Sequence, residues 1–321
     1  MLTFSIFQYN MKKVITDPAS ISQAIERIND AIDRVFRDEE RCARYEAREA
    51  SLDSKGGNSS VVLPATLRRV SSYKCDIYII RDMFEPKHYT ATGCITQTLV
   101  MQRLSLIDLF YSTSLNRYGQ FGIYELAYQI CELSKNDNGQ SFDHVLAAKA
   151  QAFVNSPLST PKLCIELFDK SYAIPDKKAV SIISKYLFFL LEAQKSPDGF
   201  PIYDSIVMNL LPKIGSKIGI PIVLKNIKDI TQYIAAIKNV AQALGIRPRN
   251  GRSVFGVLDF FLWRIGKVGE LSFSLLLTYS ELQKHSSDIE KIKDEGATPQ
   301  LLAAIPSRFS HWLKIYKYIT Q

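Results

Sequence analysis

A single lysine stands inside an apolar stretch of the chain and could act as a nucleophile. Residues 180–191 read VSIISKYLFFLL, and Lys185 is the one charged side chain among them. A helix that is apolar on every face is normally buried. Burial lowers the pKa of a lysine and makes the free amine available for attack on carbon. The pattern predicts a Schiff-base nucleophile or, as the simpler alternative, a lysine whose amine reaches solvent along its aliphatic stem.

An aspartate downstream could assist such an amine. The sequence SPDGFP at residues 196–201 predicts a break in the helix, and a helical pattern restarts at Ile202. Asp204 stands at that restart, where aspartate is a common N-cap, which is the alternative role for this residue. A helix N-terminus also stabilises negative charge, so this carboxylate could face a cationic transition state. The 19-residue separation from Lys185 lets the chain turn back and place the second helix beside the first.

The composition limits the kinds of partner and cofactor. A formal net charge of +8 and a pI of about 9.1 favour a polyanionic partner. None of the five cysteines forms a C-x-x-C pair, and the four histidines lack metal-ligand spacing. We therefore expect reduced cysteines, no metal and no other cofactor. No uncharged segment approaches the roughly 20 apolar residues of a membrane helix, and the N-terminus lacks a signal-peptide pattern, which predicts a cytoplasmic protein without membrane contact.

A long N-terminal helix is the first element expected to surround these residues. Residues 17–50 predict one helix, because Asp17 can cap it and Pro18 suits its first position. Its apolar stripe consists of Ile21, Ile25, Ile28, Ile32 and Val35. We expect this stripe to pack on the rest of the chain, and the alternative is a coiled coil that binds a protein partner or a second copy.

The remaining segments predict a mainly α protein. Residues 51–60, SLDSKGGNSS, indicate a linker, and residues 75–80, CDIYII, indicate a short β patch. Beyond Thr98 the apolar spacing is mostly helical. We therefore predict an N-terminal helical extension and linker over residues 1–60, followed by an all-α body over residues 61–321.

The block around the lysine and the aspartate resembles a known enzyme family. The sequence S-K-Y-L-F-F-L, followed by F-P-I-Y-D-S-I-V, is similar to the corresponding block of the helix-hairpin-helix DNA glycosylases, in particular the 8-oxoguanine glycosylase branch. The resemblance covers roughly residues 100–270 and implies that fold for the body. It also implies that Lys185 is the Schiff-base lysine and Asp204 the catalytic aspartate.

One part of the family pattern is missing here. The family carries a glycine-rich hairpin, L-P-G-[VI]-G, next to the lysine, whereas residues 175–183 read PDKKAVSII. Residues 211–219, LPKIGSKIG, resemble that hairpin and would make Lys217 the nucleophile. An aspartate would then be expected near position 236, where the chain has alanine. We therefore favour Lys185 with Asp204 over Lys217.

The resemblance also implies roles for residues that would handle DNA. A base inside a duplex must be flipped out before it can be excised, and side chains then fill the gap and hold the base. The candidates for these two tasks are Ser112, Leu115, Asn116, Arg117, Tyr186, Phe189, Tyr203 and Trp263. The candidates for contacts with phosphates are Lys177, Lys178, Lys213, Lys217, Arg249 and Arg252.

The function that follows from the resemblance is that of a bifunctional DNA glycosylase and AP lyase. Its partner would be double-stranded DNA and its first substrate an 8-oxoguanine-type purine. One alternative is an antiviral glycosylase that excises modified bases from phage DNA. The others are a non-catalytic DNA-binding protein of the same fold and an interaction protein organised by the N-terminal helix.

Overall fold

The computed structural model describes residues 14–53, 79–111, 122–156, 179–223, 230–266 and 314–321. Helices dominate these ranges, and within them the only β pairing is two isolated bridges, which confirms the mainly α prediction. The helices are α1 (Pro18–Asp53), η1 (Pro86–His88), α3 (Gln97–Tyr111), α4 (Ile123–Leu133), α5 (Asp143–Asn155), α7 (Val180–Ala193), α8 (Ser205–Lys217) and α9 (Ile230–Ala243). Residues 79–82, 254–266 and 314–320 are also helical. In the described ranges no helix is both long enough and apolar enough to span a membrane.

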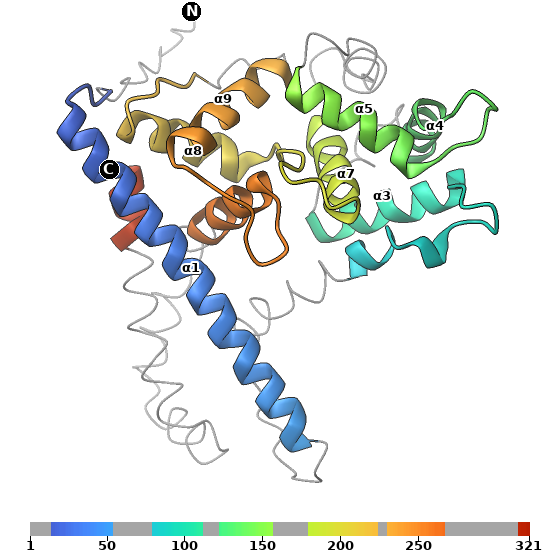
Figure 1. Cartoon of the computed structure of the whole chain (residues 1–321), viewed down its shortest axis with the longest axis horizontal. Helices are drawn as coiled ribbons and strands as arrows, with labels where there is room; N and C mark the ends of the chain where they lie inside the picture. Colours follow the sequence, from blue (N-terminus) through green and yellow to red (C-terminus); the bar gives the residue numbers. More distant parts are fainter. Residues whose placement is uncertain (1–13, 54–78, 112–121, 157–178, 224–229, 267–313) are drawn as a thin grey trace, which may run out of the picture.

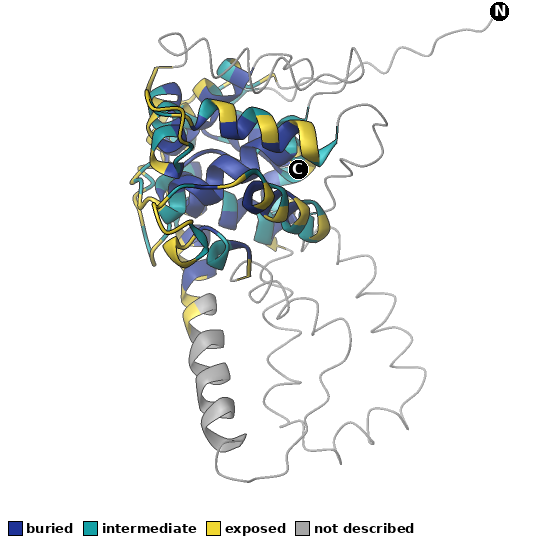
Figure 2. Ribbon diagram, turned by 90° about the vertical axis from the view of Figure 1, so that its right-hand side faces the viewer, coloured by how far each residue is buried: buried dark blue, intermediate teal, exposed yellow. Residues whose placement is uncertain are grey.

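The helices pack in two groups that share a continuous core. In one group α3 packs on α4, and α7 contacts both α3 and α5; in the other, α8 contacts α1 and α9 (Figure 1). The buried residues form one continuous cluster, and the ribbon is coloured as buried mainly on the inside of the helical body and as exposed mainly on its outside (Figure 2). Residues 182–191 of α7 are all buried. This helix is therefore the central element that its apolar sequence predicts.

The N-terminal helix α1 belongs to this core through its first half. Ile28, Ile32 and Val35 of its apolar stripe are buried, and Ile21 and Ile25 are half-buried. The next residue, Phe36, is also buried and packs on Phe260 with ring centroids 5.2 Å apart. This burial confirms the expectation that the stripe packs on the body. The boundary predicted near residue 60 lies outside the described residues.

The prediction of a β patch over residues 75–80 is wrong for residues 79 and 80, which are the part of that range that the structure describes. Residues 79–82 are helical, and the amide of Met83 donates to the carbonyl oxygens of Ile79 and Ile80 at 3.4 and 3.2 Å. Ile80 is fully buried and Ile79 is partly exposed. A short apolar run fits either kind of element, and here a single helical turn buries its isoleucine without needing a neighbouring strand.

A buried ion pair between α3 and α5 is also hydrogen-bonded to α7. The guanidinium of Arg103 on α3 donates to both carboxylate oxygens of Asp143 on α5 at 2.9 and 2.8 Å. It also donates to the hydroxyl of Tyr186 on α7 at 3.1 Å and to the carbonyl of Met83 at 2.8 Å. Tyr89 donates to Asp143 at 2.8 Å. Arg103 is 0% and Asp143 3% exposed, so the pair lies inside the core with its polar groups satisfied.

Candidate functional site

Lys185 lies in the second turn of α7, and its amine is enclosed by protein. The residue is only 2% exposed, so the alternative in which its amine reaches solvent is not what the structure shows. Its Nζ donates a hydrogen bond to Ser181 Oγ at 2.7 Å and lies 5.1 Å from the ring centroid of Tyr111. Tyr111 is the last residue of α3. The amine is thus held between the first turn of α7 and the end of α3.

Asp204 caps α8 and is tied to α7 through its neighbour in sequence. Its backbone is extended, and its carboxylate accepts the amide of Val207 at 3.0 Å, which is the N-cap geometry predicted for it. The amide of Tyr203 donates to the hydroxyl of Ser184 at 3.0 Å. Because Ser184 precedes Lys185 and Tyr203 precedes Asp204, this one hydrogen bond fixes the start of α8 beside the lysine.

A third ionisable residue, Asp259, joins this pair from the helix at residues 254–266. The amides of Val254 and Phe255 at the start of that helix donate to the carbonyl oxygens of Pro197 and Asp198 at 2.9 and 3.0 Å. The helix is thereby anchored on the loop that joins α7 to α8. Sequence reasoning missed Asp259, although it is the one acid in the apolar run FGVLDFFLW at residues 255–263. The signal available was the same as for Lys185, a single charge among apolar residues.

The loop between α7 and α8 packs so closely against Ser253 that position 199 requires a glycine. Glu192 at the end of α7 accepts the amide of Ser253 at 2.9 Å, and the Ser253 hydroxyl accepts the amide of Gly256 at 3.1 Å. Gly199 has a φ of +72°, and a β-carbon there would overlap the Ser253 hydroxyl. Only glycine combines that backbone with that approach. The position of the 254–266 helix, and with it Asp259, depends on this contact.

The charges of these three residues act on one another. Burial lowers the pKa of the Lys185 amine, and the negative charges of Asp204 and Asp259 oppose that shift only in part. Burial, followed by the charge of Asp204, raises the pKa of Asp259 to about 8, while Lys185 and Arg252 act in the opposite direction. The site therefore offers a lysine with an increased share of free amine and a carboxylic acid that is mostly protonated at neutral pH. Such a pair can attack an electrophilic carbon and exchange a proton beside it.

Replacing Asp259 with asparagine is expected to flatten the dependence of stability on pH. The folded-state pKa of about 8 lies above the ordinary value of 3.8, so the folded protein holds this proton more tightly than the unfolded chain. The associated stability is present at low pH and is lost as pH rises toward 8. Relative to wild type, Asp259→Asn should gain about 4 kcal/mol between pH 5 and pH 9, because the loss amounts to about 1.4 kcal/mol for each pH unit up to the folded-state pKa. Thermal melts at both pH values measure this, with Asp137→Asn as the exposed control, and parallel curves would contradict the assigned environment.

The predicted base-contacting residues fall into three groups. Tyr186 and Phe189 are 0% and 1% exposed and pack on Phe84, so they belong to the core and we leave them out of the proposed site. Tyr203 is half-buried and packs edge-on against Tyr233 with ring centroids 5.1 Å apart, and Trp263 is partly exposed. Outside the described residues lie Ser112, Leu115, Asn116 and Arg117.

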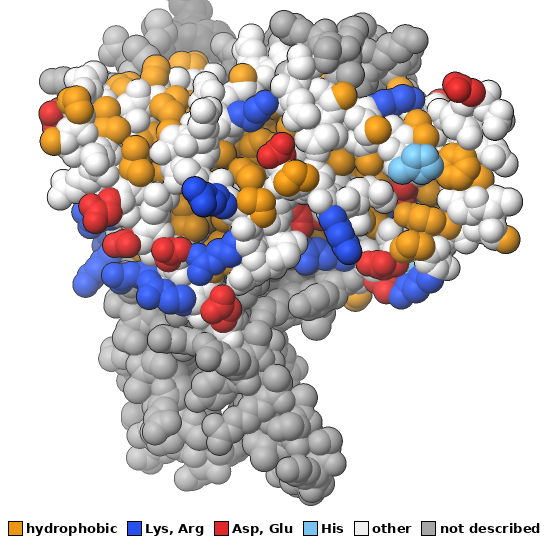
Figure 3. Space-filling model, viewed as in Figure 1, with side chains coloured by type: hydrophobic (Ala, Val, Ile, Leu, Met, Phe, Trp, Pro, Cys, Tyr) orange, Lys and Arg blue, Asp and Glu red, His pale blue; other side chains and the backbone are white. Residues whose placement is uncertain are grey.

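The predicted phosphate-contacting residues do not form one uniform basic surface. Arg249 is paired with Asp33 of α1, and the guanidinium of Arg252 lies 4.2 Å from the ring centroid of Phe260. Lys213 donates to Asn209 at 2.6 Å, and Lys217 lies 5.0 Å from the ring centroid of Tyr318. Figure 3 shows basic and acidic side chains interspersed on one face. Lys177 and Lys178 lie outside the described residues.

The segment that resembled the glycine-rich hairpin is helical. α8 continues without interruption through Leu211 and Pro212 to Lys217, and the left-handed residue Gly219, with a φ of +76°, follows its end. Lys217 is partly exposed, in contrast to the buried Lys185. The local geometry therefore gives Lys217 neither the hairpin of the family pattern nor the burial of Lys185.

In the described part of the chain, no group of three or more histidine, cysteine, aspartate or glutamate side chains is placed to hold a metal ion. Comparison with known proteins found no match among protein-family models, curated proteins or solved structures.

Proposed function

We propose that this protein is a DNA glycosylase with AP-lyase activity, in which Lys185 is the nucleophile and Asp204 its carboxylate partner. The observation that carries the proposal is the buried Lys185 amine, which interacts electrostatically with Asp204 and Asp259. Two features predicted separately from the sequence, a buried lysine and a helix-capping aspartate, lie in one site. A buried lysine with a lowered pKa and a buried acid with a raised pKa that influence one another are typical of sites that transfer protons.

The proposed chemistry assigns a separate task to each of the three residues. Asp204 stabilises positive charge that develops on the deoxyribose as the glycosidic bond weakens. The free amine of Lys185 forms a bond to C1′ while the bond from C1′ to the base breaks. The departing base takes up a proton, and Asp259, with a pKa of about 8, can donate it. The C1′–O4′ bond then breaks and opens the sugar ring to an iminium, and O4′ takes up the proton that the nitrogen loses. Loss of a C2′ proton to solvent forms a C2′–C3′ double bond while the C3′–O bond breaks and releases the 3′ phosphate.

The end of α3 is where we propose that the substrate enters. Tyr111 is the described ring that lies over the Lys185 amine, and it is the last residue of α3. Residues 112–117, which include the proposed gap-filling side chains, follow Tyr111 directly in the chain. A nucleotide flipped from the duplex would then reach the amine past Tyr111.

Borohydride trapping tests the proposal on the wild-type protein. The protein is incubated with duplex oligonucleotides that carry 8-oxoguanine, other damaged bases, phage-type modified cytosines or an abasic site. We expect a covalent adduct with abasic DNA and with at least one base substrate, and peptide mass spectrometry should place the adduct on Lys185. An 8-oxoguanine preference supports repair, and a modified-cytosine preference supports the antiviral alternative. Binding of duplex DNA without any adduct would replace the proposal with a non-catalytic DNA-binding protein.

A further inference from the structure

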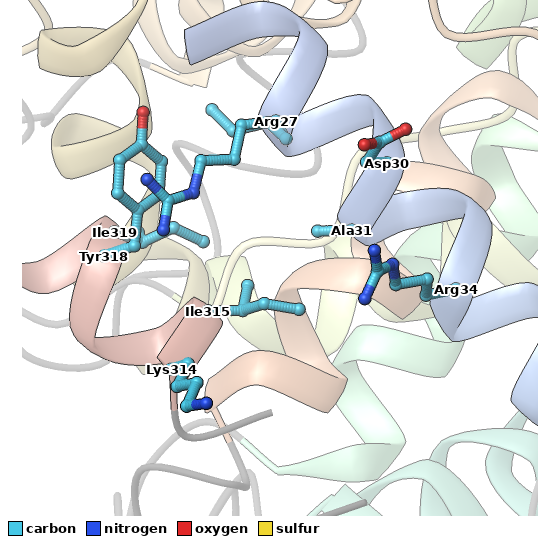
Figure 4. A pocket seen from close by; sticks show the side chains of 9 residues that line it. Arg27, Asp30, Ala31, Arg34, Lys314, Ile315, Tyr318 and Ile319 are labelled. Carbon is cyan, nitrogen blue, oxygen red and sulfur yellow. The ribbon is translucent and has the colours of Figure 1, made fainter. Parts of the chain in front are cut away.

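A second candidate site lies between α1 and the helix at residues 314–320. It is a pocket of about 320 Å³ whose lining includes Arg27, Asp30, Arg34, Lys314, Ile315 and Tyr318 (Figure 4). None of its lining residues belongs to α7, to α8 or to the 254–266 helix. The pocket is therefore separate from Lys185, Asp204 and Asp259, and the proposed DNA chemistry does not use it.

The lining of this pocket combines a basic rim with an apolar floor. Arg27, Arg34 and Lys314 are exposed at its rim, and Asp30 is the one acid in the lining. Buried or half-buried apolar side chains form the remainder, namely Ile28, Ala31, Ile315, Tyr318 and Ile319. The basic rim favours an anionic ligand, and the apolar floor favours a ligand with an organic body.

The arginines are arranged so that they can address a common anion. Arg27 and Arg34 are seven residues apart on α1 and so project from the same face of that helix. The guanidinium of Arg27 lies 3.9 Å from the ring centroid of Tyr318, a cation–π contact that restricts its position. Lys217 lies 5.0 Å from the same ring and adds positive charge next to the pocket. A guanidinium fork can bind two oxygens of a phosphate at once.

We propose that this pocket binds a small phosphate monoester with the size and chemistry of a nucleoside monophosphate. The volume of about 320 Å³ is at the lower end of the range for small-molecule sites, which fits one nucleotide. The phosphate lies between Arg34, Lys314 and Arg27, and the organic part covers the apolar floor. A DNA duplex presents its phosphates on a convex surface, so it would touch the rim and leave the floor empty.

Titration calorimetry of the full-length protein with AMP tests this proposal. We expect binding of one AMP, weakened about tenfold or more by Arg34→Gln and by Lys314→Gln, because each removes a charge-assisted hydrogen bond. The matched controls are Arg37→Gln on α1 and Lys317→Gln on the 314–320 helix, both exposed and outside the lining. These controls should bind within about twofold of wild type. Inorganic phosphate and adenosine should each bind more weakly than AMP, because each lacks half of the proposed contacts.

Three outcomes would overturn the proposal. The first is no binding of AMP to the wild-type protein, and the second is equal weakening in all four variants, which would indicate a general charge effect. The third is a loss of duplex DNA binding, but not of AMP binding, in Arg34→Gln and Lys314→Gln, which would make the rim a nucleic-acid contact. Lys185→Gln should bind AMP normally, so failure of the proposed glycosylase and failure of this pocket can be told apart.

Discussion

Replacing Lys185 with glutamine is expected to abolish covalent trapping of the protein on abasic DNA. The adduct forms only through a free amine at the reacting carbon, and the structure places the Lys185 amine in a desolvated environment with a lowered pKa. Glutamine keeps the approximate length and polarity of the side chain but cannot form an iminium. The rate of adduct formation should fall below about one thousandth of the wild-type rate, as measured by borohydride trapping under single-turnover conditions.

Lys217→Gln is the matched control for this experiment. It removes the same charge from a helix of the same body, but Lys217 is partly exposed and stands beside Tyr318 rather than beside Asp204. Its adduct rate should stay within about threefold of wild type, since exposed charges contribute little individually. Thermal melts of both variants establish that each is folded. An adduct that persists in Lys185→Gln and disappears in Lys217→Gln would transfer the nucleophile to Lys217 and remove the basis of the proposed site.

The sequence predicts the central elements of the fold because their signals are local. An apolar run interrupted by one lysine indicates a buried helix, and α7 is buried from residue 182 to residue 191. An aspartate after a proline- and glycine-containing break indicates an N-cap, and Asp204 caps α8. The run at residues 75–80 had no comparable cap or period, and its last two residues are helical instead. A run of six residues, five of them apolar or aromatic, does not distinguish a strand from a helical turn.

The sequence predicts only the part of the site that is formed by residues close together in the chain. Lys185 and Asp204 are joined by one loop, so their spacing limits how far apart they can lie. Asp259 is 74 residues beyond Lys185, and it reaches the site because the amides of Val254 and Phe255 bind the loop at residues 197–198. No periodicity encodes a contact of that kind. The Arg103–Asp143 pair was also missed, because its two residues are distant in sequence. In addition, charged residues on a helix are expected to face solvent.

Replacing Asp143 with alanine is expected to lower the free energy of unfolding by about 3–5 kcal/mol. The carboxylate neutralises the fully buried guanidinium of Arg103 and accepts two of its hydrogen bonds as well as the hydroxyl of Tyr89. Alanine leaves that guanidinium charged, because arginine does not release its proton in proteins. The cost is therefore that of an uncompensated buried charge rather than that of a lost hydrogen bond. Urea unfolding measures it, and Asp137→Ala, at an exposed position, should change stability by no more than about 0.5 kcal/mol.

The double variant Arg103→Met/Asp143→Leu separates the cost of an orphaned charge from a requirement for the pair itself. If the charge is what destabilises Asp143→Ala, removing both partners should recover most of the loss, since apolar side chains of similar volume suit a buried position. The hydroxyl of Tyr186 would then lose its partner, which costs about 1–3 kcal/mol and keeps the recovery incomplete. Tyr186 directly follows Lys185 on α7, so adduct formation by the double variant reports whether this pair also holds the nucleophile in place. A double variant no more stable than Asp143→Ala would mean that packing around α3 and α5, and not the buried charge, sets the cost.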